Sequence, residues 1–364
     1  MKLTRTIAAG GLVAVMILSF NSTAAAQGRP SWDDGSLAGV AMHSDLRIGT
    51  AVDMAAFADD PTYRERIASE FSSVTAENVM KWETLEPERG VFNYGPADEL
   101  INFARQNRQE VRGHVLLWHN QLPGWLTDGV ASGEISPTEL RGILRDHIIR
   151  TVRHFKGRVA QWDVVNEVID DNANLRDTIF LQNLGPDYIA DAFRWANQAD
   201  RRVKLYLNDY NIEGFSAKTE AYFELAQQLL ADGVPVDGLG VQGHLGVQFG
   251  FWDANSVADN LRRFEALGLD TAITEADVRM LMPPDNAKLQ GQANGYNTLL
   301  QGCLMADRCD SFTVWGFTDK YQWVPSVFAG EGSAALWDEN FQPKPAYDQV
   351  RIDLALAPSG RPRA

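Results

Sequence analysis

Residues 160–167 read AQWDVVNE, a short apolar run that ends in an asparagine and a glutamate. Residues 271–277 read TAITEAD and repeat the arrangement, with Glu275 directly after the apolar part. Short runs of this kind, rich in β-branched residues, are typical of strands in a buried sheet. Glu167 and Glu275 therefore each end a predicted strand. A glutamate at a strand end can simply point into solvent, so the residues around the pair have to decide its role.

Strand-like runs alternate with helical patterns along most of the chain. Residues 136–139 (SPTE) form a capping box with proline at the first helical position, and Gly157 ends the helix that follows. Asp60 and Pro61 open another helix in the same way, and Gly233 closes one that starts near Ala217. The predicted strands are 47–51, 74–78, 111–118, 161–166, 203–208, 238–242, 271–275 and 312–317.

Strand–helix units with mostly apolar strands predict an α/β fold, a parallel sheet closed into a single (β/α)8 TIM barrel. The alternative is a doubly wound open sheet, but no glycine-rich phosphate loop follows the first predicted strand. The sequence contains neither an internal repeat nor a linker rich in proline and serine. We therefore expect one catalytic domain over residues 27–356 and a C-terminal tail over residues 357–364.

The first residues have the pattern of a secretion signal. Lys2 and Arg5 make a basic start, residues 7–20 are apolar but too few to span a bilayer, and residues 24–26 are alanines. The alternative is a buried N-terminal helix, which these flanking residues do not favour. We expect residues 1–26 to be a signal peptide, a mature chain from Gln27, an extracellular or periplasmic destination and no membrane association after cleavage.

Charge and cysteine content limit the partners further. The formal net charge is −15, which disfavours nucleic acid and anionic membranes and suits an uncharged substrate. The two cysteines, Cys303 and Cys309, are close in an exported chain, so one disulfide across a short loop is expected. Two free buried thiols are the alternative. No zinc-type spacing of cysteine and histidine is present, so we expect no metal and no cofactor.

Polar residues gather where the predicted strands end, and half of the chain's six histidines are among them. In a (β/α)8 barrel the active site forms at the carboxyl ends of the strands. Scattered solvated residues would not follow strand ends, so a catalytic face is favoured. The set is Asp53, Glu77, Asn78, His114, Trp118, His119, Asn166, Glu167, Asn208, Asp209, Gln242, His244, Glu275, Trp315 and Trp323.

Tryptophans among carboxamides narrow the chemistry to carbohydrate. Indole faces stack on pyranose rings, while asparagine, glutamine, histidine and lysine satisfy hydroxyls. A single tryptophan is more often core than ligand platform, and we assign Trp162 and Trp195 to the core. The candidates for stacking are Trp82, Trp118, Trp315 and Trp323. With two carboxylic acids at strand ends, the set fits acid/base and nucleophilic chemistry on a glycosidic bond.

Six motifs in order resemble glycoside hydrolase family 10, the endo-β-1,4-xylanases. Residues 162–167 (WDVVNE) are similar to the acid/base signature of that family. The others are ENVMKW (77–82), GHVLLWHNQLPGW (113–125), NDYN (208–211), GVQGHL (240–245) and WGFTDKYQW (315–323). The similarity spans about residues 39–350. Departures are small: Ala276 and Gln322 stand where the family usually has a larger apolar and a small residue, respectively.

The resemblance implies roles at the reaction centre. Glu167 would be the general acid/base and Glu275 the nucleophile of a retaining mechanism. Asn166 would bind the sugar 2-hydroxyl, and His244 would orient Glu275 while Asp277 holds His244. The resemblance also matches Cys303 and Cys309 with a disulfide found in many members.

The resemblance also implies a set of substrate-binding residues. Tyr210 and Gln242 would face the cleavage point or the aglycone side, and Trp315 and Trp323 would cap the bound sugar. The glycone side would be lined by Glu77, Asn78, Lys81, His114, Trp118 and Gln121. The expected partners are xylan and xylo-oligosaccharides, bound by a monomer that needs neither metal nor cofactor.

Three other functions stay open on the residues alone. Another retaining β-glycanase, acting on cellulose or mannan, shares the two glutamates, although residues 77–82 and 113–125 favour xylan. A non-catalytic carbohydrate-binding protein has no need of two carboxylates across one bond. A metal-dependent hydrolase would lose its activity on chelation.

Overall fold

The strands form a closed parallel ring in the computed structural model, which describes residues 32–33 and 35–359. Their order is β8-β6-β5-β4-β3-β2-β1-β9, and pairing of β8 with β9 closes the ring. The predicted (β/α)8 barrel is therefore confirmed, and the open sheet is excluded. The ring strands are β1 (Arg47–Val52), β2 (Ser73–Ala76), β3 (Glu110–Gly113), β4 (Gln161–Asn166), β5 (Lys204–Asp209), β6 (Gly238–Val241), β8 (Asp270–Leu281) and β9 (Cys309–Val314).

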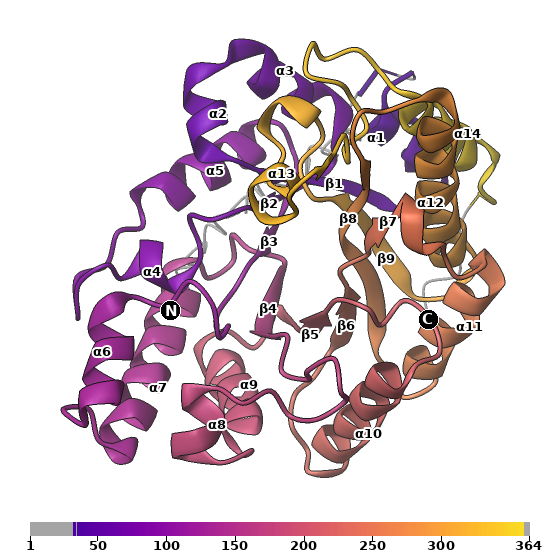
Figure 1. Cartoon of the computed structure of the whole chain (residues 1–364). Helices are drawn as coiled ribbons and strands as arrows, with labels where there is room; N and C mark the ends of the chain where they lie inside the picture. Colours follow the sequence, from indigo (N-terminus) through magenta and orange to yellow (C-terminus); the bar gives the residue numbers. More distant parts are fainter. Residues whose placement is uncertain (1–31, 34, 360–364) are drawn as a thin grey trace, which may run out of the picture. The chain divides into compact units, whose positions relative to one another are not determined.

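Helices surround the ring on its outside (Figure 1). The α-helices are α1 (Leu37–Ala41), α2 (Met54–Asp59), α3 (Pro61–Glu70), α4 (Trp82–Leu85), α5 (Gly95–Gln106), α6 (Gly124–Ser132), α7 (Pro137–His154), α8 (Ile179–Leu184), α9 (Tyr188–Ala199), α10 (Ala217–Ala231), α11 (Ala254–Glu265), α12 (Asn286–Met305), α13 (Val324–Val327) and α14 (Pro345–Leu356). Short 3₁₀ helices η1 (Met42–Ser44), η2 (Val247–Phe249) and η3 (Asp319–Tyr321) lie in the connections.

The helix signals in the sequence are confirmed at three places. The hydroxyl of Ser136 accepts a hydrogen bond from the backbone of Glu139 at the start of α7. The Asp60 carboxylate caps α3 in the same manner. Gly233 follows α10 with a φ of 66°, a left-handed conformation that glycine adopts without the steric cost of a Cβ atom.

Two strands, β3 and β8, differ from their predicted lengths by more than one residue, and β9 runs over Cys309–Val314 where residues 312–317 were predicted. β3 ends at Gly113 and not at Trp118, because the chain then leaves the ladder and contacts β4 again through Leu116 N, which donates to the Asp163 carbonyl oxygen at 3.0 Å. β8 continues past Glu275 to Leu281. Its extension is held by parallel pairing with β7 (His244–Gly246) and antiparallel pairing with β10 (Glu331–Gly332).

The interior of the barrel contains charged groups as well as apolar ones. Arg112 and Asp163 form an ion pair there, and their side chains are 6% and 1% exposed. Arg112 also donates to the side chain of Gln161 at 2.6 Å. Burial would raise the pKa of Asp163, but the charges of Arg112 and His114 outweigh it and hold the pKa below its ordinary value.

Close packing around this interior depends on a glycine in β3. A Cβ atom on Gly113 would lie 2.3 Å from the ring of Trp162. Trp162 is 1% exposed, so its predicted place in the core is confirmed.

The predicted signal peptide, residues 1–26, lies outside the described residues. At the other end α14 stops at Leu356, and the carbonyl oxygen of Ala357 lies 2.9 Å from Nε2 of His43. Residues 360–364 of the predicted tail also lie outside the described part. Within residues 32–33 and 35–359, no helix has both the length and the apolar character needed to cross a membrane.

A disulfide joins Cys303, near the end of α12, to Cys309 at the start of β9. The predicted bond is therefore confirmed, and the alternative of two free thiols is excluded. It closes a loop with a sequence separation of only 6 residues. Because β9 begins here, the bond lies at the end of the barrel opposite the carboxyl ends of the strands.

Replacing both cysteines by alanine is expected to lower the free energy of unfolding by about 2 kcal/mol, the loop-closure value for so short a loop. Chemical denaturation of the oxidised wild type and of the Cys303→Ala/Cys309→Ala variant measures the difference. The wild type in a reducing buffer is the control and should match the variant. A decrease in the free energy of unfolding of more than about 4 kcal/mol would show that the disulfide does more than close a short loop.

Candidate functional site

A cavity of about 730 Å³ lies at the carboxyl ends of the strands. Its walls come from the segments that follow β2, β3, β4, β5, β6 and β9 and from β8 itself. Among the residues to which the family resemblance gives a catalytic or binding role, Asp277 alone does not line it; of the other predicted strand-end residues, Asp53, His119, Asn208 and Asp209 do not line it either. The lining consists of Glu77, Asn78, Lys81, His114, Trp118, Asn120, Gln121, Asn166, Glu167, Tyr210, Asn211, Gln242, His244, Glu275, Arg279, Trp315, Trp323, Ser326, Val327 and Phe328.

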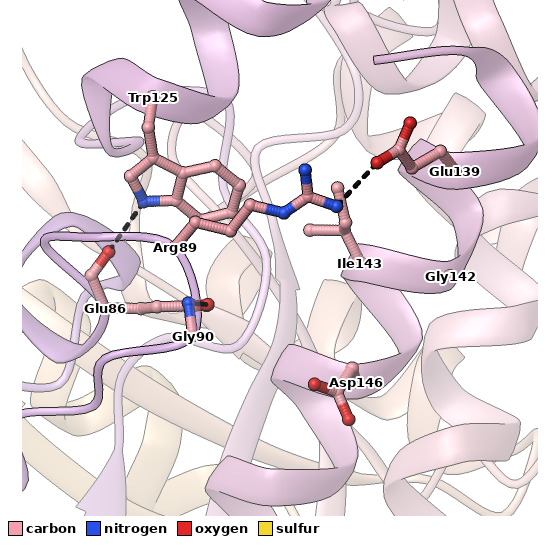
Figure 2. A pocket seen from close by; sticks show the side chains of 8 residues that line it. All are labelled: Glu86, Arg89, Gly90, Trp125, Glu139, Gly142, Ile143 and Asp146. Atoms are coloured by element: carbon pink, nitrogen blue, oxygen red, sulfur yellow. Dashed lines mark hydrogen bonds and ion pairs between the residues drawn. The ribbon is translucent and has the colours of Figure 1, made fainter.

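A second cavity, of about 340 Å³, lies on the outside of the ring (Figure 2). It is lined by α6, α7 and the segment after α4, and an ion pair of 2.6 Å between Arg89 and Glu139 lies at its edge. The indole nitrogen of Trp125 donates to the Glu86 carbonyl oxygen, so the tryptophan is tied to the loop that it covers. No strand-end residue reaches this cavity. The larger cavity is therefore the candidate site.

Glu167 lies directly after β4 in a left-handed backbone conformation, with a φ of 57°. Its backbone N–H donates to the carbonyl oxygen of Asn208, at 2.9 Å. Its Oε1 accepts from the side-chain amides of Asn166 and Gln242, both at 3.2 Å. The side chain is thus held by two neutral donors, and the residue is only 9% exposed.

Glu275 lies within β8 and has charged neighbours. His244 Nε2 is 3.3 Å from its Oε2, and His114 Nδ1 is 3.9 Å from its Oε1. Burial would raise the pKa of Glu275, but the electrostatic effect of His114 and the hydrogen bond of His244 outweigh burial and lower it. The carboxyl group is therefore ionised at neutral pH.

Asn208 bridges the two strand ends that carry the glutamates. Its Nδ2 lies 2.8 Å from Oδ1 of Asn166 and also 2.8 Å from Oε1 of Glu275, while Thr274 donates to its Oδ1. Gly240 in β6 makes room for this amide, because a Cβ atom there would lie 2.3 Å from its oxygen. Glu167 and Glu275 consequently belong to one hydrogen-bonded network. Asn208 was assigned no role from the sequence, although its place at the end of a predicted strand marked it.

His244 lies between two carboxylates. Its Nδ1 is 3.1 Å from Oδ2 of Asp277, which is fully buried and also accepts from the indole of Trp323 at 2.7 Å. Burial alone would lower the pKa of His244, but the charge of Asp277 and the contact with Glu275 raise it to about 10. At neutral pH the imidazole is a cation that faces Glu275. Asp277 therefore contacts His244 through the ring nitrogen that does not face Glu275.

Three of the four proposed stacking tryptophans line the cavity, and Trp82 does not. Trp315 meets His114 edge to face, and Trp323 meets His244 likewise. Trp82 is 2% exposed, stacks on His147 and donates to Glu86. The prediction for Trp82 was wrong, because α4 directs its ring into the core between the strand ends and α7.

A polar cluster forms the wall that follows β2. Lys81 Nζ donates to the side chains of Gln121, at 2.5 Å, and Asn78, at 3.0 Å. Burial lowers the pKa of Lys81, although the surrounding carboxylates oppose the shift. Burial, with the charge of Asp53 nearby, raises the pKa of Glu77 to about 7. The wall therefore presents both hydrogen-bond donors and hydrogen-bond acceptors to the cavity.

Six lining residues were not predicted. Asn120 and Asn211 stand inside quoted motifs and could have been found by their neighbours. Arg279 lies on the part of β8 that the sequence did not reveal, and its guanidinium packs 4.1 Å from the ring of Phe328. Phe328 itself follows the short helix α13, and the remaining two residues, Ser326 and Val327, lie in that helix.

Among the described residues, no group of three or more histidine, cysteine, aspartate or glutamate side chains could hold a metal ion.

Comparisons with protein families, with curated proteins and with solved structures all point to the same family. The family described as Glycosyl hydrolase family 10 matches residues 36–352. The chain is 42% identical over 305 residues to an endo-1,4-beta-xylanase of Agaricus bisporus, covering 83% of this chain and 89% of that protein. It is 42% identical over 284 residues to endo-1,4-beta-xylanase 1 of Gibberella zeae, covering 76% and 79%. A crystal structure of xylanase 10B from Thermotoga petrophila in complex with xylobiose superposes with a TM-score of 0.83 at 41% identity, covering 88% and 97%.

The charge on His244 gives a pH-dependent contribution to stability. Its pKa is raised from 6.5 to about 10 in the folded chain, so the contribution is complete below pH 6.5 and is lost as the pH rises through about 10. We expect the difference in unfolding free energy between wild type and His244→Gln to shrink over that range. Chemical denaturation at a series of pH values measures it. A difference that stays constant would show that His244 gains no proton on folding.

Proposed function

The chain belongs to glycosyl hydrolase family 10, and on that premise we propose that it is an endo-1,4-β-xylanase. It hydrolyses internal β-1,4-xylosidic bonds of xylan by a retaining double displacement. The observation that carries the assignment is that Glu167, directly after β4, and Glu275, within β8, line one cavity. A network through Asn166 and Asn208 joins them.

In the first step Glu275 attacks the anomeric carbon of the xylosyl unit. The bond from that carbon to the glycosidic oxygen breaks, and Glu167 gives its proton to the departing oxygen. A covalent ester between the sugar and Glu275 forms. The lowered pKa of Glu275 supports this role, because only the ionised carboxylate is a nucleophile.

In the second step Glu167, now a carboxylate, accepts a proton from water as the water oxygen attacks the anomeric carbon. The ester bond breaks, and Glu275 leaves as a carboxylate. Two inversions at one carbon retain the β configuration. Retention requires the two carboxyl groups to be about 5–5.5 Å apart, so that one can attack while the other protonates.

The remaining residues hold the substrate. Asn166 binds the 2-hydroxyl of the sugar at the cleavage point, and His244, held by Asp277, orients Glu275. Tyr210 and Gln242 serve the cleavage point or the aglycone side. Trp315 and Trp323 cap the sugar, and the glycone side is bound by Glu77, Asn78, Lys81, His114, Trp118 and Gln121. The enclosure of these groups in a cavity with carboxamides and indoles supports the choice of an uncharged sugar chain.

Secretion and a monomeric state complete the proposal. The basic, apolar and alanine-rich start of the chain supports export, with cleavage after residue 26 and a mature domain over residues 27–356. The disulfide supports an oxidising destination outside the cytoplasm.

Variants of the two glutamates separate their roles. Glu275→Ala should lose at least about 10⁴-fold in kcat on xylan, because no covalent intermediate can form. Azide should restore cleavage of an aryl xylobioside and give the α-xylobiosyl azide, the inverted product. Glu167→Ala should lose about 10²–10⁴-fold in kcat/KM on xylan. It should keep kcat/KM within roughly tenfold on a dinitrophenyl xylobioside, because that leaving group needs no proton.

Glu139→Ala is the matched control, since this glutamate lies at the outer cavity, away from the strand ends. It should keep the wild-type activity on both substrates. Wild-type turnover by Glu275→Ala would refute its role as the nucleophile. Equal losses on the two leaving groups would show that Glu167 is not the acid.

The polysaccharide itself is tested by release of reducing ends. The mature protein should act on xylan at least about 100-fold faster than on carboxymethylcellulose or mannan, because a site shaped for pentoses excludes the additional hydroxymethyl group of hexoses. Retained activity with a chelator present is the control that excludes a metal-dependent hydrolase. Comparable rates on all three polymers would contradict the assignment as a xylanase and indicate a general β-glycanase.

A further inference from the structure

The backbone of Glu167 is held in its left-handed conformation by contacts on both of its peptide groups. A left-handed φ of 57° at a residue with a Cβ atom is unfavourable by about 1–2 kcal/mol, so it persists only where neighbours impose it. On one side the N–H bonds to Asn208 of the adjacent strand. On the other side the carbonyl oxygen accepts from Nε of Arg176, at 2.7 Å.

Arg176 lies nine residues further along the chain, at the end of the loop that follows β4. This loop turns back on itself through a bridge between Ile169 and Leu175 and a bond from the Arg176 N–H to the Val168 carbonyl oxygen, at 2.8 Å. The loop therefore returns Arg176 to the end of β4. Its guanidinium then reaches the residue that begins the loop.

A second nitrogen of the same guanidinium contacts the loop after β4 and the residue that follows β5. Nη2 donates to the carbonyl oxygen of Ile169, at 3.1 Å, and to the hydroxyl of Tyr210, at 3.0 Å. One planar group thus touches oxygen atoms of residues 167, 169 and 210, from two different strand ends. The fork of donors in arginine permits this geometry, and a lysine ammonium could not reproduce it.

Tyr210 is fixed on its other sides as well. The ammonium of Lys218 lies 3.5 Å from the centre of its ring, and its hydroxyl is 3.3 Å from Oδ2 of Asp171. Lys218 is itself anchored to Asp209, at 2.8 Å. The ring can therefore move only if the guanidinium or the lysine moves with it.

The hydrogen bonds of Arg176 are not explained by packing alone. Arg176 is half-buried, and all three oxygens that it contacts belong to neutral groups. An apolar side chain of similar length would fill the same space. The feature that only arginine supplies is a rigid link between the backbone of Glu167 and the phenol of Tyr210.

We propose that Arg176 is a positioning residue that holds Glu167 and Tyr210 in one fixed geometry, so that the proton donor stays aligned with the glycosidic oxygen. The inference rests on the proposed function, because it requires Glu167 to be the acid/base. It adds that the loop over residues 168–176 contributes to leaving-group protonation without touching the substrate. Misalignment by about 1 Å can cost on the order of 100-fold in rate.

The test compares two aryl xylobiosides in Arg176→Met and Arg176→Lys. With phenyl as leaving group, which needs protonation, kcat/KM of Arg176→Met should fall on the order of 100-fold. With dinitrophenyl, kcat/KM should stay within roughly tenfold of wild type, because that step needs no acid. Arg176→Lys should show the same selective loss, since it keeps the charge but not the fork of donors.

Azide gives a readout that a purely structural role would not change. The second step on the dinitrophenyl substrate needs Glu167 as a base for water, so kcat should fall in the Arg176 variants. Azide attacks without a base and should restore kcat, with β-xylobiosyl azide as product.

Arg158→Met is the matched control. Arg158 is also partly buried, donates to a backbone carbonyl oxygen, that of His154, and pairs with Asp98, but it precedes β4 at the other end of the barrel. It should lower stability without selective loss on phenyl xylobioside.

Equal losses on both leaving groups in the Arg176 variants, or no azide rescue, would overturn the positioning role. Glu167→Ala, measured in parallel, separates this failure from failure of the proposed function. If Glu167→Ala discriminates between the leaving groups and the Arg176 variants do not, only the role of Arg176 falls.

Discussion

The site depends most on the contacts that the buried carboxylate of Asp163 makes with Arg112 and His114. It compensates Arg112 in the barrel interior, and its Oδ2 lies 3.0 Å from Nδ1 of His114. A buried guanidinium without a partner would be strongly unfavourable, by about 3–5 kcal/mol. The same carboxylate contacts His114, whose imidazole contributes to the lowered pKa of Glu275, although the charge of Asp163 itself opposes that shift. The groups that stabilise the barrel interior are thus linked to Glu275 by a continuous series of side-chain contacts, from Arg112 through Asp163 and His114.

The two glutamates differ in what surrounds them, and the difference suits different tasks. Glu275 is in contact with two imidazoles, one of them held as a cation by Asp277. The carboxylate of Glu167 accepts hydrogen bonds from the neutral amides of Asn166 and Gln242, and Lys81 and Arg176 act on it through their charges. An ionised nucleophile needs nearby positive charge, whereas a proton donor that must change its state twice in a cycle is better served by neutral partners. Environment, and not residue type, distinguishes the two roles.

The barrel and most of the cavity were predictable because their signals are local. Apolar strands end in polar residues, and ordered motifs place those residues on one face of the ring. The bridging role of Asn208 was not predictable, because it depends on the absence of a Cβ atom at Gly240 on the neighbouring strand. The burial of Trp82 depends on the direction of a helix of only 4 residues, which no periodicity defines. Arg279 was missed because β8 is extended by pairing with distant segments.

The extension of β8 also limits where residues can be inserted or deleted without disturbing the site. Side chains alternate between the two faces of a strand, so Glu275, Asp277 and Arg279 share one face by their spacing of two residues. Inserting or deleting a single residue between them would turn at least one of these side chains to the opposite face. The connection after Leu281, where β8 ends, could change in length without this effect. This stretch of strand fixes the spacing between Glu275 and Asp277, the two carboxyl groups that His244 contacts.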